Sequence, residues 1–365
     1  MSFLIAFISA LKRYKSFEEI SKEAEKQLLL ALKTSYMLDG KLTEEIAGKF
    51  KGEPYIAKPM SGKEDKDPKI IYKYIADTKR EWVRFCLVQL DFFIEKKCPS
   101  EEYGYVLNKK DEIKNKVFEA LEIASKNKAD VICFPELSVS KEWAEEIKNC
   151  YNDMIIIGGS YYDEGNNVCP IIIDGIYIDP PYKKHCPSPE ENPDTTGRGM
   201  RSGNILYIIQ TKCGMFSVLT CIDYGDQSYR ICRHKDKIVD FIINPCYDRN
   251  IFRFQHRCNS GCEDYNVSVI QVNKAPDKSR YGGSCIIGKE HEDILNKLEG
   301  DGFKPKDDIK YKLCQLDGEI MIIAKLNIRM KAPPVNLPIN YAGRINISKE
   351  TCYKFENGYW VSLSN

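Results

Sequence analysis

Three residues that can share one reaction lie far apart in the sequence, each where an expected strand ends. Glu136 follows the apolar run DVICFP, Lys184 follows a hairpin-like segment, and Cys221 follows the apolar run MFSVLT. A carboxylate beside apolar neighbours should have a raised pKa and can act as a general base. A lysine ammonium can donate hydrogen bonds to a developing oxyanion, and a cysteine can act as a nucleophile.

Each of these residues also has an ordinary explanation when it is taken alone. Glu136 could be a surface glutamate, Lys183 and Lys184 a solvated basic pair, and Cys221 one more buried cysteine among fifteen. Cys221 is distinguished by its surroundings, because a helix is expected directly after it. The dipole of that helix favours a thiolate, and the order strand, nucleophile, helix is that of a nucleophile elbow.

Short strands and a few helices are expected to position these residues from Trp82 onward. Apolar periodicity predicts a strand from Val83 and a helix at about 111–127. Asp174-Gly175 predicts one hairpin turn, and residues 211–214 a second. Further strands are expected in DVICFPE, MIIIGGSYY, VDFIIN, VSVIQVN, GSCIIG and EIMIIAKL. Strands mixed with a few helices indicate an α/β sandwich with covered sheets.

The ends of the chain differ in pattern from this central part. Ser16 and Glu19 form a capping-box pattern, and apolar residues then recur at helical spacing. Residues 51–69 are rich in glycine, proline and charge. The expected division is a helical N-terminal region at 1–50, a linker or loop at 51–81, the main domain at 82–331, and a C-terminal extension at 332–365.

Composition restricts the class of protein. Of 365 residues, 43% are hydrophobic and 29% charged, which is typical of a soluble globular protein. The net charge of +1 argues against a strong nucleic-acid binder. The apolar start, Met1 to Ala10, is too short to span a membrane, so no membrane partner is expected.

The fifteen cysteines lack the dense, regular spacing of a secreted disulfide framework. Many lie in apolar, strand-like runs, which predicts buried free thiols and a reducing cytoplasmic location. Cys258 and Cys262, with His256, have a spacing that argues against zinc, and no second pair accompanies them. No metal or cofactor is therefore expected.

In the order Glu, Lys, Cys, the three residues resemble the catalytic triad of the nitrilase (carbon–nitrogen hydrolase) superfamily. The matching motifs are Phe134-Pro135-Glu136, Tyr182-Lys183-Lys184-His185, and Gly214 through Cys221-Ile222-Asp223. The segments DFIINPCYD, VSVIQVNKA, GGSCIIG and DGEIMIIAKLNI are also similar to family motifs, so the resemblance covers about residues 82–330. The chain departs from the family in a short interval between Glu136 and Lys184 and in a charged insertion at 289–312.

The resemblance implies an α-β-β-α sandwich in which Glu136 is the base, Lys184 the oxyanion donor and Cys221 the nucleophile. It implies a second catalytic glutamate, for which Glu191 is preferred over Glu190. Implied substrate contacts come from Glu190, Ile222, Tyr182 and Tyr247.

The substrate class that the resemblance implies is a small amide or carbamoyl compound. Ile222-Asp223 stands where true nitrilases carry Trp-Glu, which favours amide over nitrile. Acyl transfer to another amine stays open, and the family implies a homo-oligomer. The alternative is a non-catalytic binding or signalling module that keeps the fold and acts through its N-terminal helices.

Overall fold

The computed structural model describes residues 67–97, 102–194, 197–234, 239–249, 256–258, 265, 267–277, 281–288, 312–315, 318–328 and 347–363. The chain divides into two units, Met1–Asp65 and Lys66–Asn365. The helical region expected at 1–50, most of the linker and the insertion at 289–312 lie outside the described residues, apart from Lys312.

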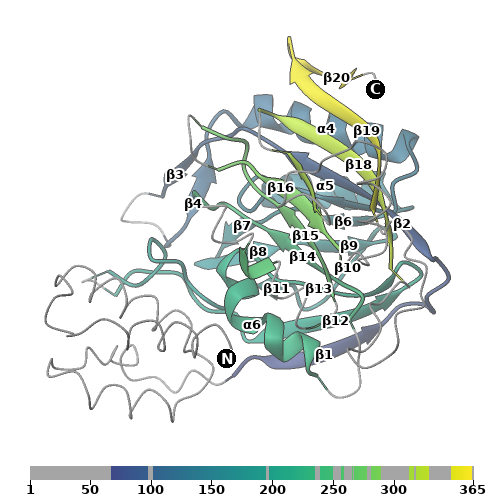
Figure 1. The fold of residues 1–365 in the computed structure, drawn as a ribbon. Coiled ribbons are helices and arrows are strands. Elements are labelled where there is room, and N and C mark those ends of the chain that lie inside the picture. The colour runs from purple at the N-terminus through teal and green to yellow at the C-terminus, as the bar shows by residue number, and fades with distance from the viewer. Residues whose placement is uncertain are drawn as a thin grey trace, which may run out of the picture. The chain divides into compact units, whose positions relative to one another are not determined.

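Two large sheets form the body of the second unit among the described residues (Figure 1). The first sheet has the order β1 (Lys69–Tyr74), β12 (Ile205–Thr211), β13 (Gly214–Val218), β14 (Phe241–Pro245), β15 (Ser268–Val272), β16 (Ser284–Ile287), β17 (Lys312–Gln315). The second has the order β10 (Ile176–Tyr177), β9 (Ile171–Ile173), β6 (Ile155–Ile157), β5 (Val131–Cys133), β2 (Trp82–Gln89), β18 (Ile320–Asn327), β19 (Ile347–Glu356), β20 (Tyr359–Leu363). Both sheets mix parallel and antiparallel neighbours.

Smaller elements complete the described fold. One small sheet has the order β11 (Tyr182–Lys183), β8 (Asn166–Cys169), β7 (Tyr161–Asp163), and β3 (Ile94–Lys96) pairs with β4 (Tyr105–Leu107). The helices are α4 (Lys110–Lys126), α5 (Lys141–Cys150) and α6 (Ile222–Cys232).

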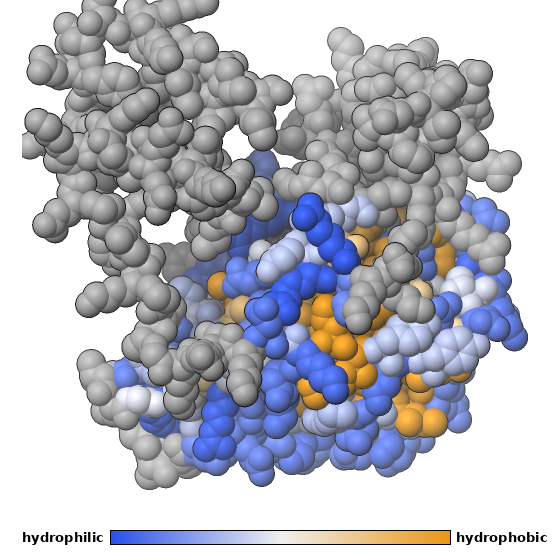
Figure 2. Space-filling model, turned by 90° about the horizontal axis from the view of Figure 1, so that it is seen from below, coloured by the Kyte–Doolittle hydropathy of each residue, from blue (hydrophilic) through white to orange (hydrophobic). Residues whose placement is uncertain are grey.

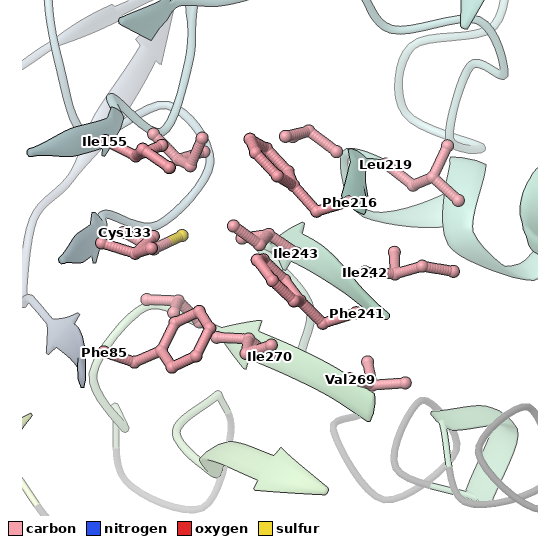
Figure 3. Packing of buried hydrophobic residues seen from close by; sticks show 14 of the residues in the cluster. Phe85, Cys133, Ile155, Phe216, Leu219, Phe241, Ile242, Ile243, Val269 and Ile270 are labelled. Atoms are coloured by element: carbon pink, nitrogen blue, oxygen red, sulfur yellow. The ribbon is translucent and has the colours of Figure 1, made fainter. Parts of the chain in front are cut away.

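A hydrophobic layer fills the space between the two large sheets. Phe85 of β2 meets Phe241 of β14 edge-on, with ring centroids 5.1 Å apart, and Phe241 stacks on Phe216 of β13 at 5.2 Å. Cys133 and Ile155 of the second sheet point into the same layer (Figure 3). Burying an aromatic or branched aliphatic side chain stabilises the fold by about 1.5–3 kcal/mol. This layer therefore holds the sheets face to face.

Helices cover the outer faces of both sheets. Val117 and Leu121 of α4 and Ile147 of α5 share a second hydrophobic cluster with Ile132 and Ile156. The latter two alternate along their strands with inward-facing neighbours, so they face outward.

On the first sheet, Ile242 and Val269 point away from the inner layer (Figure 3) and belong to the cluster that includes Ile231 of α6. The order of layers is helix, sheet, sheet, helix. The expected α-β-β-α sandwich is confirmed.

Most of the expected elements between residues 82 and 328 are present. β2 covers the strand predicted from Val83, and α4 covers the helix predicted at about 111–127. Asp174 and Gly175, with φ of 48° and 77°, turn the hairpin of β9 and β10. β12 and β13 pair around the turn at 211–214. These elements were recognisable because their apolar periods and turn residues are local signals.

Two expectations about the flanks need correction. Residues 69–74, inside the expected linker, form β1, which pairs in parallel with β12. The poorly patterned extension contains β19 and β20, an antiparallel hairpin that adds two strands to the second sheet. Both segments owe their structure to pairing with strands distant in sequence. Such pairing leaves little local signal.

Exposed apolar side chains of the described residues lie largely on edge strands. Tyr74 and Ile75 lie at the end of β1, and Tyr359, Val361 and Leu363 alternate along β20. Among the coloured residues of Figure 2 most are hydrophilic, and hydrophobic ones are most extensive at the centre of the view and toward its right side. Among the described helices, none combines the length and apolar character needed to cross a lipid bilayer. The exposed apolar residues of β1 and β20 are positions to substitute when the expected self-association is tested.

Candidate active site

The three residues expected to form a triad converge on one buried location. Glu136 lies just beyond β5, and its backbone N–H donates to the carbonyl of Cys246 at 3.2 Å. Lys184 follows β11, and Cys221 lies between β13 and α6. Their exposed fractions are 2%, 1% and 6%.

Lys184 lies between two carboxylates. Its Nζ donates to Glu136 Oε1 at 2.9 Å and to Glu191 Oε2 at 2.6 Å. Burial opposes the lysine charge, but the two carboxylates outweigh it and raise the pKa of Lys184 well above its ordinary value. Lys183 is half-buried. The structure therefore brings together Lys184, and not Lys183, with Glu136.

The small sheet β11-β8-β7 positions the polar part of the site. Asn167 of β8 lies opposite Tyr162 of β7, and its carbonyl accepts the N–H of Lys184 at 2.8 Å. The Asn167 side chain donates to Glu136 Oε1 at 2.8 Å and to Glu191 Oε1 at 3.2 Å. The small sheet thus places Asn167 and Lys184 against the same pair of carboxylates.

Glu136 has the contacts of a base that can accept a proton from Cys221. Its Oε2 accepts the backbone N–H of Tyr247 at 3.1 Å, and its carboxyl group hydrogen-bonds with the Cys221 thiol. Burial raises the pKa of Glu136, and the neighbouring Glu191 acts in the same direction, while Lys184 opposes them. The raised pKa that the sequence predicted for Glu136 is confirmed.

Glu191 has the opposite electrostatic setting. It accepts hydrogen bonds from Lys184, from the Tyr162 hydroxyl at 2.5 Å and from the Ser188 N–H at 2.8 Å. Burial opposes its charge, but these donors prevail and lower the pKa of Glu191 to about 2. The side chain of Glu190 is exposed instead. Glu191, the preferred of the two, is therefore the glutamate that joins the buried cluster, and substrate contact by Glu190 stays a prediction.

Cys221 occupies a strained turn at the start of α6. Its φ of 50° and ψ of −117° lie in a region that residues other than glycine rarely adopt. Asn244 supports this turn, because its side chain donates to the carbonyls of Leu219 at 2.5 Å and Cys221 at 3.1 Å. The Cys221 N–H donates to the Pro245 carbonyl at 2.8 Å. This is the geometry of a nucleophile elbow, as predicted.

The resting charge of Cys221 differs from the expectation. A hydrogen bond with Cys246, burial and the nearby Glu136 charge together raise the pKa of Cys221 well above its ordinary value. The direction is opposite to the expected one: these neighbours favour the protonated thiol over the thiolate. A base is therefore needed to remove its proton, and Glu136 is in contact with it.

Asp223, two residues after Cys221, is the centre of a second group of buried hydrogen bonds. Its carboxylate accepts the backbone N–H groups of His185 at 2.8 Å and Cys186 at 2.6 Å, together with the Tyr182 hydroxyl at 2.5 Å. Tyr182 also accepts the Thr220 N–H at 3.1 Å. These bonds tie the segment after Lys184 to the nucleophile turn. The hydroxyl of Tyr182 is bonded to these partners, and substrate contact by Tyr182 stays a prediction.

Tyr247 and Ile222 are half-buried near the site. The Tyr247 ring lies 5.6 Å from that of Phe92 and 5.0 Å from that of Tyr281, and Arg249 donates to the Tyr281 hydroxyl at 2.9 Å. Ile222 begins α6, where the first backbone N–H groups lack intrahelical acceptors. Substrate contact by Tyr247 and Ile222 stays a prediction.

Sequence reasoning missed several residues of this site. Asn167, Tyr162, Asn244 and Cys246 contact the expected residues only after strands distant in sequence have paired. Their local sequence, such as EGNNVC around Asn167, carries no motif that marks them. The described residues contain no group of three or more His, Cys, Asp or Glu arranged to hold a metal ion.

Comparisons with known proteins give structural relatives. No family model matches the sequence, and no curated protein matches it. Solved structures do resemble it. Nit3 of Saccharomyces cerevisiae, described as a member of branch 10 of the nitrilase superfamily, is 18% identical, with a TM-score of 0.47 over 69% of this chain and 93% of that chain.

Two further solved structures have names of the same kind. A carbon–nitrogen hydrolase from Helicobacter pylori G27 is 14% identical, with a TM-score of 0.48 over 68% of this chain and 90% of that chain. An amidase from Nesterenkonia sp. is 12% identical, with a TM-score of 0.42 over 59% of this chain and 84% of that chain. The similarity is one of fold, and the chemistry has to be argued from the site itself.

Proposed function

We propose that this protein hydrolyses the carbon–nitrogen bond of a small, non-peptide amide or carbamoyl compound through a cysteine thioester. One observation carries the proposal. Lys184, paired with Glu136 and Glu191, lies in a buried site where Glu136 also contacts the Cys221 thiol. A nucleophile, a base in contact with it and a fixed cation are the parts that acyl transfer requires.

The reaction begins when substrate reaches the protonated thiol. Glu136 takes the proton of Cys221, and the sulfur attacks the substrate carbonyl carbon. The negative charge that develops on the carbonyl oxygen is stabilised by the Lys184 ammonium and the Ile222 N–H. Glu136 returns the proton to the departing nitrogen, which leaves as ammonia or an amine. A thioester on Cys221 remains.

The second half of the reaction releases the acid. Glu136 removes a proton from water, the resulting hydroxide attacks the thioester, and the Cys221 sulfur leaves as the thiol. The two glutamates have pKa values shifted in opposite directions, so one can exchange protons while the other stays ionised. Glu136 exchanges protons, while Glu191 stays ionised and keeps Lys184 charged and oriented.

Ammonia release and thiol labelling test the proposal. Purified protein should release ammonia from at least one member of a panel of aliphatic amides and N-carbamoyl compounds. Cys221→Ala should abolish this release, while Cys150→Ser, a change at an exposed cysteine of α5, should not. Iodoacetamide should label Cys221 faster than Cys150, as measured by peptide mass spectrometry.

The same measurements can reject the proposal. Ammonia release that survives Cys221→Ala would exclude the thioester route. A Cys221 that labels no faster than Cys150, in a protein without activity on the panel, would favour a binding module that keeps the fold.

A further inference from the structure

A second thiol that the proposed reaction does not use lies against Cys221. Cys246 follows β14, and the carbonyl of the preceding residue, Pro245, accepts the N–H of Cys221 at 2.8 Å. The side chains of Cys221 and Cys246 hydrogen-bond with each other. The two thiols are therefore neighbours, next to the backbone hydrogen bond that joins Cys221 to Pro245.

This arrangement suits a disulfide. Strands joined by backbone hydrogen bonds lie about 4.8 Å apart. Disulfides join α-carbons that are about 4.4–6.8 Å apart. The hydrogen bond from the Cys221 N–H to Pro245 continues the parallel pairing of β13 with β14. It places Cys221 beside Cys246, and the two thiols hydrogen-bond with each other. Closing an S–S bond needs rotation of the side chains and no large movement of either strand.

The two thiols differ in solvent exposure, which predicts different roles when an oxidant enters the site. Cys221 is 6% exposed, whereas Cys246 is fully buried. Cys246 is held by Asn244, whose Oδ1 accepts the thiol proton at 2.7 Å, and by Gln271, whose side-chain N–H group donates to the sulfur at 3.6 Å. A small oxidant entering the site meets Cys221 first. Cys246 is then the sulfur within reach of whatever forms there.

We propose that Cys246 is a resolving thiol, so that a hydroperoxide converts the Cys221–Cys246 pair into a disulfide that reversibly blocks the nucleophile. Glu136 takes the proton of Cys221, and the thiolate attacks one peroxide oxygen. The O–O bond breaks, water or an alcohol leaves, and Cys221 becomes a sulfenic acid. The Cys246 sulfur then attacks the Cys221 sulfur, an S–S bond forms, and the hydroxyl group leaves as water. Two thiols lose two electrons in total, and the peroxide is reduced by the same two.

The pairing also protects Cys221 from irreversible loss. A sulfenic acid that finds no thiol is oxidised further to sulfinic and sulfonic acids, which ordinary reductants do not reverse. A neighbouring thiol captures the sulfenic acid before that happens. The inference holds whether or not the protein hydrolyses amides, because its product is a covalent bond detectable by mass.

Hydrogen peroxide and peptide mapping under non-reducing conditions test the inference on the full chain. The wild-type protein should yield a peptide pair linked through Cys221 and Cys246. Dithiothreitol should then restore iodoacetamide labelling of Cys221. In Cys246→Ala, Cys221 should instead accumulate as sulfinic or sulfonic acid, and dithiothreitol should not restore its labelling.

Cys285→Ala is the matched control, since Cys285 is equally buried and also contacts Gln271. It should form the same linked pair as the wild type. Recovery of sulfinic acid at Cys221 without the linked pair in the wild-type protein would overturn the inference, even if Cys246→Ala failed to fold. Failure of the hydrolase proposal would appear separately, as absence of ammonia release from fully reduced protein.

Discussion

Two buried carboxylate clusters lie close to Cys221, and they differ in what satisfies the negative charge. In one cluster, Glu136 and Glu191 share the ammonium of Lys184. In the other cluster, Asp223 accepts hydrogen bonds from two backbone N–H groups and the Tyr182 hydroxyl. The first cluster contains groups that can exchange protons or stabilise new charge, and the second contains a network of fixed donors.

The hydrogen-bond partners of a buried carboxylate indicate whether it takes part in chemistry or holds segments of the chain in place. Asp223 uses both oxygens on groups that join two segments of chain, so its loss should loosen the site. Glu136 contacts the thiol of Cys221, and its pKa is raised. Changes in the Lys184 cluster should therefore act mainly on rate, and changes in the Asp223 cluster mainly on stability.

The largest effect is expected from Glu136→Gln, which keeps the shape of the side chain and removes the base. General base catalysis contributes about 10²–10⁴-fold, so kcat should fall by about that factor. Labelling of Cys221 by iodoacetamide should slow in parallel. A variant with full activity and unchanged labelling would contradict the assignment of Glu136 as the base.

Lys184→Ala should have the next largest effect. Loss of an oxyanion donor lowers kcat by about 10²–10³. Removing the cation also leaves Glu136 and Glu191 buried without it, which costs about 3–5 kcal/mol of unfolding free energy. Kinetics and urea denaturation measure the two effects. Lys183→Ala, at the adjacent half-buried position, is the control and should change both only slightly.

Tyr182→Phe tests the Asp223 cluster. It removes one hydrogen bond to Asp223 and one acceptor for the Thr220 N–H. A hydrogen bond to a charged group contributes about 1.5–3 kcal/mol, so unfolding free energy should fall by about that amount, with a smaller effect on kcat than Lys184→Ala. An effect on kcat larger than that of Lys184→Ala would place Tyr182 in the chemistry after all.

The pH dependence of stability should separate the two glutamates. The pKa of Glu191 is lowered to about 2, so its ionised form stabilises the fold above its ordinary value of 4.5, and this contribution is lost as pH falls toward 2. The pKa of Glu136 is raised, so its contribution is present below 4.5 and is lost as pH rises through the raised value.

Urea denaturation of Glu191→Gln and Glu136→Gln at acidic and neutral pH measures this difference. Relative to the wild type, Glu191→Gln should be most destabilising at neutral pH, and Glu136→Gln at acidic pH. If both variants lost the most unfolding free energy at the same pH, the opposite pKa shifts of the two carboxylates would be contradicted.

The smallest effect on the site is expected from deleting residues 1–65, the first unit of the chain. The residues of both clusters come from positions 136–223, so thiol labelling of Cys221 should stay unchanged. The apolar helical pattern at 1–50 predicts that the deletion changes self-association or solubility instead. Light scattering during size-exclusion chromatography measures this. The cut belongs before β1, which begins at Lys69.

Local patterns in the sequence determined much of the site. The motif Tyr182-Lys183-Lys184-His185 distinguished Lys184 from Lys183, and the strand–helix junction identified Cys221 as the residue at a nucleophile elbow. Apolar runs ending in polar residues marked the ends of β5 and β13. These features depend on periods of two and 3.6 residues and on turn chemistry, which are properties of neighbouring residues.

Only the tertiary structure decided which distant side chains meet. It bonded Glu191 to Lys184, added Asn167 between the carboxylates, and placed Cys246 against Cys221. It also reversed the expected pKa shift of Cys221, because the neighbouring Cys246 thiol and burial both raise that pKa. Burial and cross-strand contacts follow from how the sheets pair and pack, and a single stretch of sequence does not contain that information.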